Sequence, residues 1–201
     1  MRIYKRVLQC MLLLLVVASC SKKEEGYVPK PRGFQRIVLP EHVYQAFPDT
    51  GEFVNYPYRF ELSKFSTIVP DTSFMTEPYW FELYYPNFKA SIDISYKPVP
   101  NYDSLIGYTN TAGKLTFKHN VKATAIEESR TTTPNGDVAV MFELEGEVPS
   151  QFQFFVTDSS QHFFRAALYF PTATANDSLA PVIDYMKQDM IHMINTLKWK
   201  K

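Results

Sequence analysis

Short segments in which apolar and polar residues alternate recur along this chain, and they predict β-strands. The first segment ends near Pro70, a residue with no backbone N–H to donate to a sheet. Only residues 86–89 separate the next two segments, which suits an antiparallel hairpin and is too short for a parallel crossover. The predicted strands are residues 58–68, 80–85, 90–96, 138–144, 151–156 and 162–170.

A helical period replaces the alternation in two other parts of the chain. Near the C-terminus apolar residues form one stripe, with Asp177 or Ser178 as the N-cap and Pro181 in the first turn. In the middle, residues 115–128 are compatible with a helix, and a shorter helical piece can begin at Asp103. The C-terminal stripe consists of Ile183, Met186, Met190, Ile194 and Leu197.

Together these elements predict one α+β domain over residues 37–201. We expect a mainly antiparallel β-sheet with a long C-terminal α-helix packed on one face. This arrangement resembles the α-β-α sandwich of PsbP and Mog1 proteins. A fold does not determine a function, so that likeness leaves the activity open.

Residues 1–19 have a different pattern, which is typical of a bacterial lipoprotein signal peptide. Three basic residues precede an apolar run that ends at Ala18 and is too short to span a bilayer as a helix. Ser19 and Cys20 then form the cleavage site, and Cys20 becomes the acylated first residue of the mature chain. Acyl chains such as palmitate would hold the protein stably at a membrane.

Residues 20–36 predict a lipidated, charged and proline-containing tether without apolar periodicity. Fully extended, the residues after Cys20 would reach roughly 50 Å. The domain would therefore work in the cell envelope, on a lipid anchor. We favour the outer membrane, on its periplasmic or surface side, with the inner membrane as the alternative.

Composition narrows the chemistry of the mature protein. The chain has two cysteines, Cys10 in the signal and the acylated Cys20, so disulfides and cysteine metal sites are excluded. The whole chain carries 21 basic and 21 acidic residues, and cleavage removes three of the basic ones. Nucleic acid is not an expected partner of this slightly acidic protein, because its binding needs a basic surface.

The histidines do not form a recognisable catalytic or metal-binding motif, so we expect no enzyme activity, no metal and no cofactor. Asp189 and His192 lie three residues apart on the C-terminal helix and can touch, but this spacing is common on polar helix faces. Asp158 and His162 flank a turn. They form either a small acid–base or metal site or, as we favour, ordinary turn contacts in which Asp158 caps backbone N–H groups.

Arg165 is the most unusual charged residue, because it lies inside the apolar strand 162–170. If its face of the sheet is covered, the guanidinium needs a partner, since an isolated buried charge is very costly. Asp93 and Glu143 on other strands are the candidate partners in a structural ion pair. The alternative is an anion-binding pocket built on Arg165, with Asp158 and His162 nearby.

Aromatic residues are abundant, with 16 Phe, 13 Tyr and 2 Trp. Tyrosine and tryptophan are favoured at protein interfaces, where the ring is buried and the polar tip is paired. They are also favoured in β-sheets, and the sequence does not separate the two explanations. The groups in question are 56–58, 79–81 and 84–85.

Several short phrases, in their order and spacing, are similar to the gliding-motility lipoprotein GldD family of Bacteroidota. The resemblance covers essentially the whole chain. The phrases are PKPRG (29–33), YRFE (58–61), YYP (84–86), IDISYK (92–97), His119, QFQFFVTD (151–158), HFFRAALYF (162–170), NDS (176–178) and LKW (197–199).

The resemblance implies a role in gliding motility and in type IX protein secretion, and it supplies no catalytic residues. We therefore expect a non-catalytic component or assembly factor, anchored through Cys20, whose partners are other gliding or secretion proteins. Two alternatives stay open. One is a ligand- or anion-binding lipoprotein that uses Arg165, and the other is a hydrolase with an unrecognised site.

Overall fold

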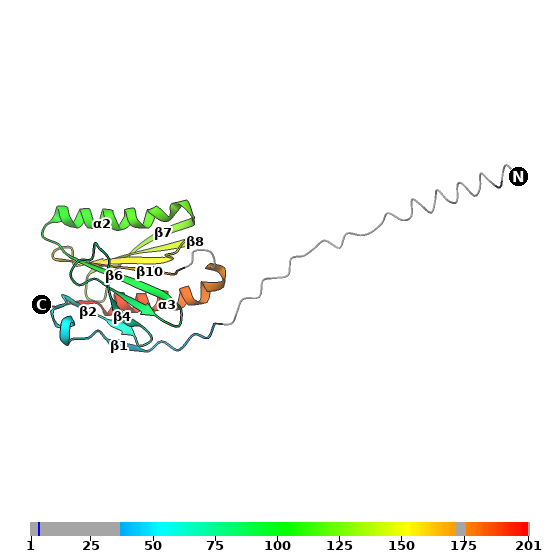
Figure 1. Ribbon diagram of the computed structural model, residues 1–201. Helices are drawn as coiled ribbons and strands as arrows, with labels where there is room; N and C mark the ends of the chain where they lie inside the picture. Colours follow the sequence, from blue (N-terminus) through cyan, green and yellow to red (C-terminus); the bar gives the residue numbers. More distant parts are fainter. Residues whose placement is uncertain (1–3, 5–36, 172–175, 201) are drawn as a thin grey trace. The chain divides into compact units, whose positions relative to one another are not determined.

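The computed structural model describes residue 4, residues 37–171 and residues 176–200 (Figure 1). The chain divides into two units, Met1–Phe34 and Gln35–Lys201, and the described elements belong to the second. Apart from Tyr4, the signal peptide lies outside the described residues, as do the cleavage site at Ser19 and Cys20 and the tether 20–36, so all of them stay predictions. No helix in the described part of the chain has the length and apolar character needed to cross a membrane.

The second unit is built on a seven-stranded sheet with the order β4-β5-β6-β10-β9-β8-β7. Every neighbouring pair in this sheet is antiparallel, which confirms the predicted α+β class and the mainly antiparallel sheet. The strands are β4 (Thr67–Pro70), β5 (Phe81–Tyr85), β6 (Ala90–Pro98), β7 (Ala123–Thr132), β8 (Val138–Gly146), β9 (Phe152–Thr157) and β10 (His162–Tyr169).

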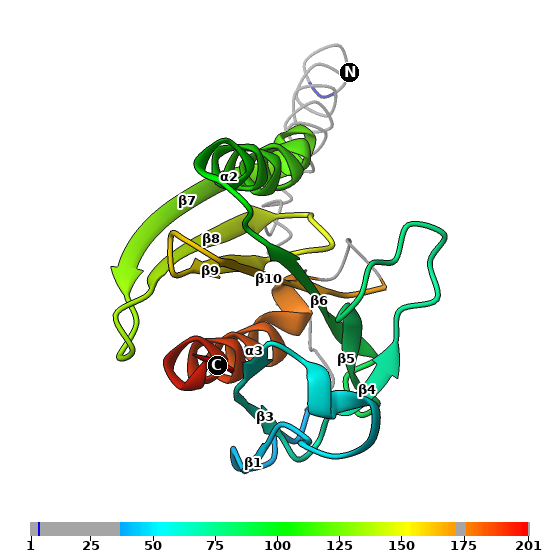
Figure 2. The same ribbon diagram turned by 90° about the vertical axis from the view of Figure 1, so that its left-hand side faces the viewer.

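Two helices lie on opposite faces of the sheet (Figures 1 and 2). Helix α2 (Tyr102–Phe117) shares one buried cluster with β8, β9 and β10, which includes Leu105, Phe155 and Phe163. Helix α3 (Asn176–Thr196) shares a larger cluster with the other face, which includes Met190 and Phe164. Because side chains alternate between the faces of a strand, the central strands supply both clusters at once.

Four short strands lie outside the large sheet. β1 (Tyr44–Ala46) pairs with β3 (Glu61–Ser63), and β2 (Tyr58–Arg59) pairs with β11 (Lys198–Trp199). A 3-10 helix, η2 (Gly51–Asn55), lies between β1 and β2, and a second, η3 (Lys118–Val121), follows α2. Through the β2–β11 pair, the C-terminal end of the domain returns to its N-terminal part.

The helix predicted at 115–128 is wrong over most of its length. Residues 123–132 form β7, which pairs with β8, while α2 fills residues 102–117. β7 is an edge strand with no buried residue, so its polar pattern does not show the alternation typical of a half-buried strand. α2 is also longer than the piece expected from Asp103, and its N-cap is Asn101, whose Oδ1 accepts from Ser104 N at 2.9 Å.

The single strand predicted at 58–68 is split into β2, β3 and β4. A turn after Ser63, closed by the hydrogen bond from Ser66 N to Ser63 O at 3.1 Å, redirects the chain from β3 to β4. The alternation continues across this turn, which is why periodicity alone did not reveal it. α3 has 21 residues and begins at Asn176, so Asp177 and Ser178 lie inside its first turn. The likeness to PsbP and Mog1 proteins stays a prediction.

Candidate functional site

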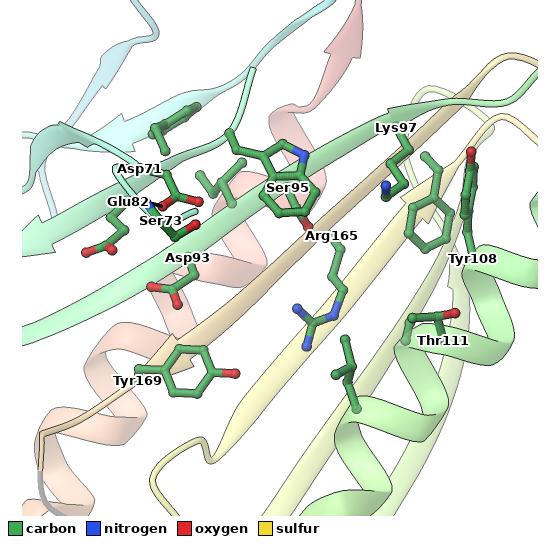
Figure 3. A pocket seen from close by; sticks show the side chains of 16 residues that line it. Asp71, Ser73, Glu82, Asp93, Ser95, Lys97, Tyr108, Thr111, Arg165 and Tyr169 are labelled. Carbon is green, nitrogen blue, oxygen red and sulfur yellow. Dashed lines mark hydrogen bonds between the residues drawn. The ribbon is translucent and has the colours of Figure 1, made fainter. Parts of the chain in front are cut away.

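A cavity of about 390 Å³ lies between α2, the connection from β4 to β5, and the strands β5, β6 and β10 (Figure 3). On β10, Phe163, Arg165 and Tyr169 line it, while the alternate residues Phe164, Ala166 and Leu168 belong to the cluster under α3. The alternation of the strand therefore places Arg165 on the wall of this cavity.

A neutral amide orients Arg165. Its Nη2 donates to Oε1 of Gln153 at 2.5 Å, and Gln153 is almost completely buried. The amide is fixed in turn, because its Oε1 accepts from Thr116 Oγ1 at 3.2 Å and its Nε2 donates to Ser150 Oγ at 2.9 Å. The hydrogen bond that orients the guanidinium is therefore made to a neutral amide and not to a carboxylate.

The two carboxylates suggested by the sequence do not pair with Arg165, so the predicted ion pair is wrong. Glu143 lies opposite Phe152 in the sheet, on the α3 face, and accepts from Lys187 Nζ at 2.5 Å. Asp93 is on the correct face, but its strand partner is Ala167, two residues from Arg165. A diagonal pair of this kind is separated by roughly 7–8 Å.

Asp93 has an unfavourable electrostatic environment. Its strand partner on β5 is Glu82, so two carboxyl groups face each other across the ladder. Burial, assisted by the charges of Glu82 and Asp71, raises the pKa of Asp93 to about 6, although Ser91 and Arg165 oppose the rise. The folded protein therefore binds a proton at Asp93 more tightly than the unfolded chain does.

We expect Asp93→Asn to stabilise the protein at pH 8 and to have little effect at pH 4. A raised pKa contributes stability below pH 4, and that stability is lost as the pH rises through about 6. Because Asp93 is only half-buried, we expect a gain of about 1–2 kcal/mol rather than the full linkage value. Urea unfolding at both pH values measures it, with the exposed Asp184→Asn as control. Equal effects at the two pH values would contradict the assignment.

An apolar wall completes the cavity. Trp80 donates its ring N–H to the carbonyl oxygen of Tyr96 at 2.8 Å, which fixes the indole over β6. The Lys97 ammonium lies 5.4 Å from the Trp80 ring centroid and 5.6 Å from that of Tyr108 on α2, and it pairs with Glu77. Lys97 is therefore already engaged in cation–π and ionic contacts.

A second polar cluster lies on the opposite side of the sheet, and we call Asp189, His42, Tyr44 and Tyr85 the Asp189 cluster. The carboxylate of Asp189 is buried, with an exposed fraction of 3%. Its Oδ1 lies 2.6 Å from His42 Nδ1 and accepts from the Tyr44 hydroxyl at 3.0 Å, while its Oδ2 accepts from the Tyr85 hydroxyl at 3.0 Å. Burial, reinforced by Asp189, raises the pKa of both tyrosines, so both hydroxyls keep their protons and donate.

The cluster joins distant parts of the chain, because His42 and Tyr44 come from the start of the domain and Asp189 from its last helix. The possible contact between Asp189 and His192 is not among the hydrogen bonds of either side chain. His192 lies 2.8 Å from Glu61 Oε2, and its ring stacks on Tyr44 with centroids 3.6 Å apart. Both residues thus fasten β1 and β3 to α3.

Asp158 and His162 do not contact each other through their side chains in any hydrogen bond of the described residues. Asp158 Oδ1 accepts from the backbone N–H groups of Ser160, Gln161 and His162 at 2.9–3.0 Å. Burial opposes ionisation of Asp158, but these hydrogen bonds lower the pKa of its carboxyl. The arrangement is that of a capped turn. Within the described residues, no three His, Cys, Asp or Glu side chains are grouped to hold a metal ion.

His162 lies on the other face of β10 from Arg165. Its Nδ1 is 2.7 Å from the Tyr96 hydroxyl, and its ring stacks on Trp199 with centroids 4.7 Å apart. Burial raises the pKa of Tyr96 to about 12, so that hydroxyl is the donor to His162. Neither His162 nor Asp158 lines the cavity, so the three residues that the sequence grouped do not form one site.

Three of the seven aromatic residues in the three groups are buried in the core. Tyr58, Phe81 and Tyr85 are at most 2% exposed, and Tyr58 stacks edge-on against Phe164 at 5.0 Å. Among the remaining aromatic residues of the three groups, Tyr84 is exposed, and Tyr56, Tyr79 and Trp80 are half-buried. The interface explanation of these aromatics is therefore wrong for the buried members. Two adjacent apolar side chains that are strongly exposed, Phe74 and Met75, lie on the β4–β5 connection beside the cavity.

The sequence reasoning missed Gln153, His42 and Tyr44. A signal for the Asp189 cluster was present, since Asp189 lies between Met186 and Met193 on the apolar stripe of the helix. A carboxylate in such a position needs hydrogen-bonding partners. Which residues supply them depends on how β1 is placed against α3, and local spacing carries no information about that.

Comparison with known proteins gives one result. A family model described as gliding motility lipoprotein GldD matches residues 24–199, which include every described residue of the domain from Ile37 to Trp199. No curated protein matches the chain.

Proposed function

Since the chain belongs to the gliding motility lipoprotein GldD family, we propose that it is a lipid-anchored, non-catalytic component or assembly factor of gliding motility and of the associated type IX protein secretion. The family match is the observation that carries this proposal. It places the protein among lipoproteins, and hence in the cell envelope, and implies involvement in gliding motility. The secretion role, the assembly role and the choice of the outer membrane are our own extension.

Two observations support a structural and binding role. The predicted signal peptide is followed directly by Cys20, and acylation of Cys20 would attach the mature chain to a membrane. Two side chains that could serve acid–base chemistry are engaged in contacts that hold the fold. His42 contacts Asp189, and Asp158 accepts from backbone N–H groups.

The exposed connection between β4 and β5 is the surface that we propose for partner contacts. Phe74 and Met75 are exposed there, with fractions of 104% and 79%. Adjacent exposed apolar side chains of this size are a common feature of protein-binding surfaces.

We expect a strain without this protein to lose gliding, and a strain that makes only Cys20→Ala not to recover it. Both strains should also secrete less protein through the type IX pathway, and crosslinking of the wild type should recover other motility or secretion proteins. Colony spreading, secreted-protein profiles and crosslinked partners are the measurements. Protease treatment of intact cells, compared between wild type and Cys20→Ala, would report the side of the membrane on which the domain lies.

Normal gliding and secretion in the deletion strain, together with recovery of no motility or secretion protein, would overturn the proposal. Full function of Cys20→Ala would instead contradict only the lipid anchor and leave the rest of the proposal standing. Phe74→Ser, in a fold that stays intact, tests the partner surface, and Asn110→Ala, at an exposed position of α2, serves as the control.

The cavity favours a second candidate function, which is binding of a small anionic ligand through Arg165. A concave site with an apolar wall and a few convergent polar groups is typical of ligand-binding proteins. Arg165 can supply the positive charge of such a site, because its hydrogen-bond partner is the neutral amide of Gln153.

A further inference from the structure

The cavity contains charges of both signs that do not neutralise one another at contact distance. Arg165 forms no ion pair with a described carboxylate. Asp71, Glu82 and Asp93 also line the cavity, and none of them forms an ion pair with a described cation. In Figure 3 these three carboxylates gather on one side of Arg165, while Lys97, Tyr108 and Thr111 lie on the other.

The arrangement of the three carboxylates lowers the stability of the fold. Glu82 and Asp93 are direct partners across β5 and β6, and like charges in this position are destabilising. The hydrogen bonds that these groups do make, from Ser91 Oγ to Asp93 at 2.9 Å and from Ser73 N to Asp71 at 2.8 Å, are local. Local conflicts of this kind in a concave site are typical of functional positions.

The placement of opposite charges on two sides of the cavity favours a ligand that carries both signs. Asp93 lies diagonally from Arg165 across β6 and β10, so roughly 7–8 Å separates their positions on the sheet. A ligand in the cavity could place a carboxylate on Arg165 and an ammonium near Asp93 at the same time. The planar guanidinium suits a carboxylate, because it offers parallel donors to both oxygen atoms.

We propose that this cavity binds a zwitterionic ligand of the size of an amino acid or short peptide, with its carboxylate on Arg165, its ammonium among Asp71, Glu82 and Asp93, and an apolar side chain against Trp80 and Tyr108. This inference deepens the second candidate function and rests on it. The volume of about 390 Å³ lies in the range of small-ligand sites. The apolar wall is rigid, because the indole of Trp80 is hydrogen-bonded to the backbone of β6.

Calorimetric titration of the full chain, purified from membranes in mild detergent, tests the proposal with four probes. These are alanylphenylalanine, its C-terminal amide, its N-acetyl derivative and free phenylalanine. We expect saturable binding of alanylphenylalanine or phenylalanine, and loss of about tenfold or more in affinity for the amide and for the N-acetyl derivative. Tighter binding of the free amino acid would identify it as the ligand class, and tighter binding of the dipeptide would identify peptides.

The variants separate the two charged sides. Arg165→Gln should lower the affinity about tenfold or more for whichever of alanylphenylalanine and phenylalanine binds more tightly. It should leave the affinity for the C-terminal amide of alanylphenylalanine unchanged. Glu82→Gln should weaken the zwitterion and leave the N-acetyl derivative unaffected. Arg130→Gln, an exposed arginine on β7 outside the cavity, is the matched control and should bind like the wild type.

Equal binding of all four probes, unchanged binding by folded Arg165→Gln, or no saturable binding of any probe would overturn the proposal. If Arg165→Gln does not fold, Glu82→Gln and the two blocked probes decide the question alone. The proposed role in motility is tested separately, because deletion of the protein can abolish gliding whether or not the cavity binds these probes. A strain with Arg165→Gln that glides normally but has lost zwitterion binding would show that the two functions are independent.

Discussion

Replacing Asp189 by alanine should lower the free energy of unfolding by about 3–5 kcal/mol, because the substitution removes the centre of a buried hydrogen-bond network. The carboxylate is 3% exposed and contacts one histidine and two tyrosine hydroxyls at 2.6–3.0 Å. Alanine would leave His42, Tyr44 and Tyr85 without their common acceptor. Unsatisfied buried polar groups are costly, and β1 would lose its polar attachment to α3.

Urea unfolding followed by circular dichroism measures this effect, and Asp184→Ala supplies the matched control. Asp184 lies on the same helix and is exposed, so its replacement should change stability by about 0.5 kcal/mol or less. Asp189→Asn should fall between the two, because the amide keeps one oxygen acceptor but not both. If Asp189→Ala and Asp184→Ala unfold at the same urea concentration, the cluster does not stabilise the domain.

Phe164→Ala should also lower the free energy of unfolding by about 3–5 kcal/mol, through a different mechanism. Phe164 lies in the middle of β10 with an exposed fraction of 0%, and its ring packs against Tyr58, Phe60 and Phe154 at centroid distances of 5.0–6.1 Å. Truncation would leave a cavity lined by large rings, which cannot collapse around the smaller side chain.

The control for this variant is Phe74→Ala, which removes the same atoms from a side chain that is exposed. Its unfolding midpoint in urea should match that of the wild type, with a change of about 0.5 kcal/mol or less. A large loss for Phe74→Ala and a small one for Phe164→Ala would mean that burial is assigned to the wrong residue.

The two variants probe features that differ in how far the sequence reveals them. Phe164 lies in the strand 162–170, which is apolar at nearly every position, so its burial could be predicted from the local sequence pattern. Asp189 could be recognised as a carboxylate on an apolar stripe, but its partners could not. His42 is 147 positions away in the chain, and a contact over that separation depends on tertiary packing alone.

The errors in the middle of the chain have a related cause. β7 pairs with β8 along its whole length, yet none of its residues is buried. Hydrophobic periodicity reports burial, so an edge strand with two largely solvated faces gives little signal. The turn after Ser63 was hidden for the opposite reason, because buried residues continue on both sides of it.

The grouping of Arg165 with His162 and Asp158 shows the same limit at the level of a site. Alternation along β10 placed Arg165 correctly on one face, but it also puts His162 on the other. The cavity instead takes its remaining walls from α2, β5, β6 and the β4–β5 connection. These segments meet only because β6 pairs with β10, a neighbour distant in sequence.

Five strands of the central sheet (β5, β6, β8, β9 and β10), the hairpins that join them, the amphipathic C-terminal helix and the expected lipid attachment at Cys20 could be predicted from the sequence, because each depends on residues within a few positions of one another. The tertiary structure was needed to show that Gln153 rather than a carboxylate holds Arg165, that Asp189 joins the start of the domain to its last helix, and that many of the abundant aromatic residues are buried in the core. These features depend on which distant segments share a face of the sheet. That choice is made by the packing of the whole domain.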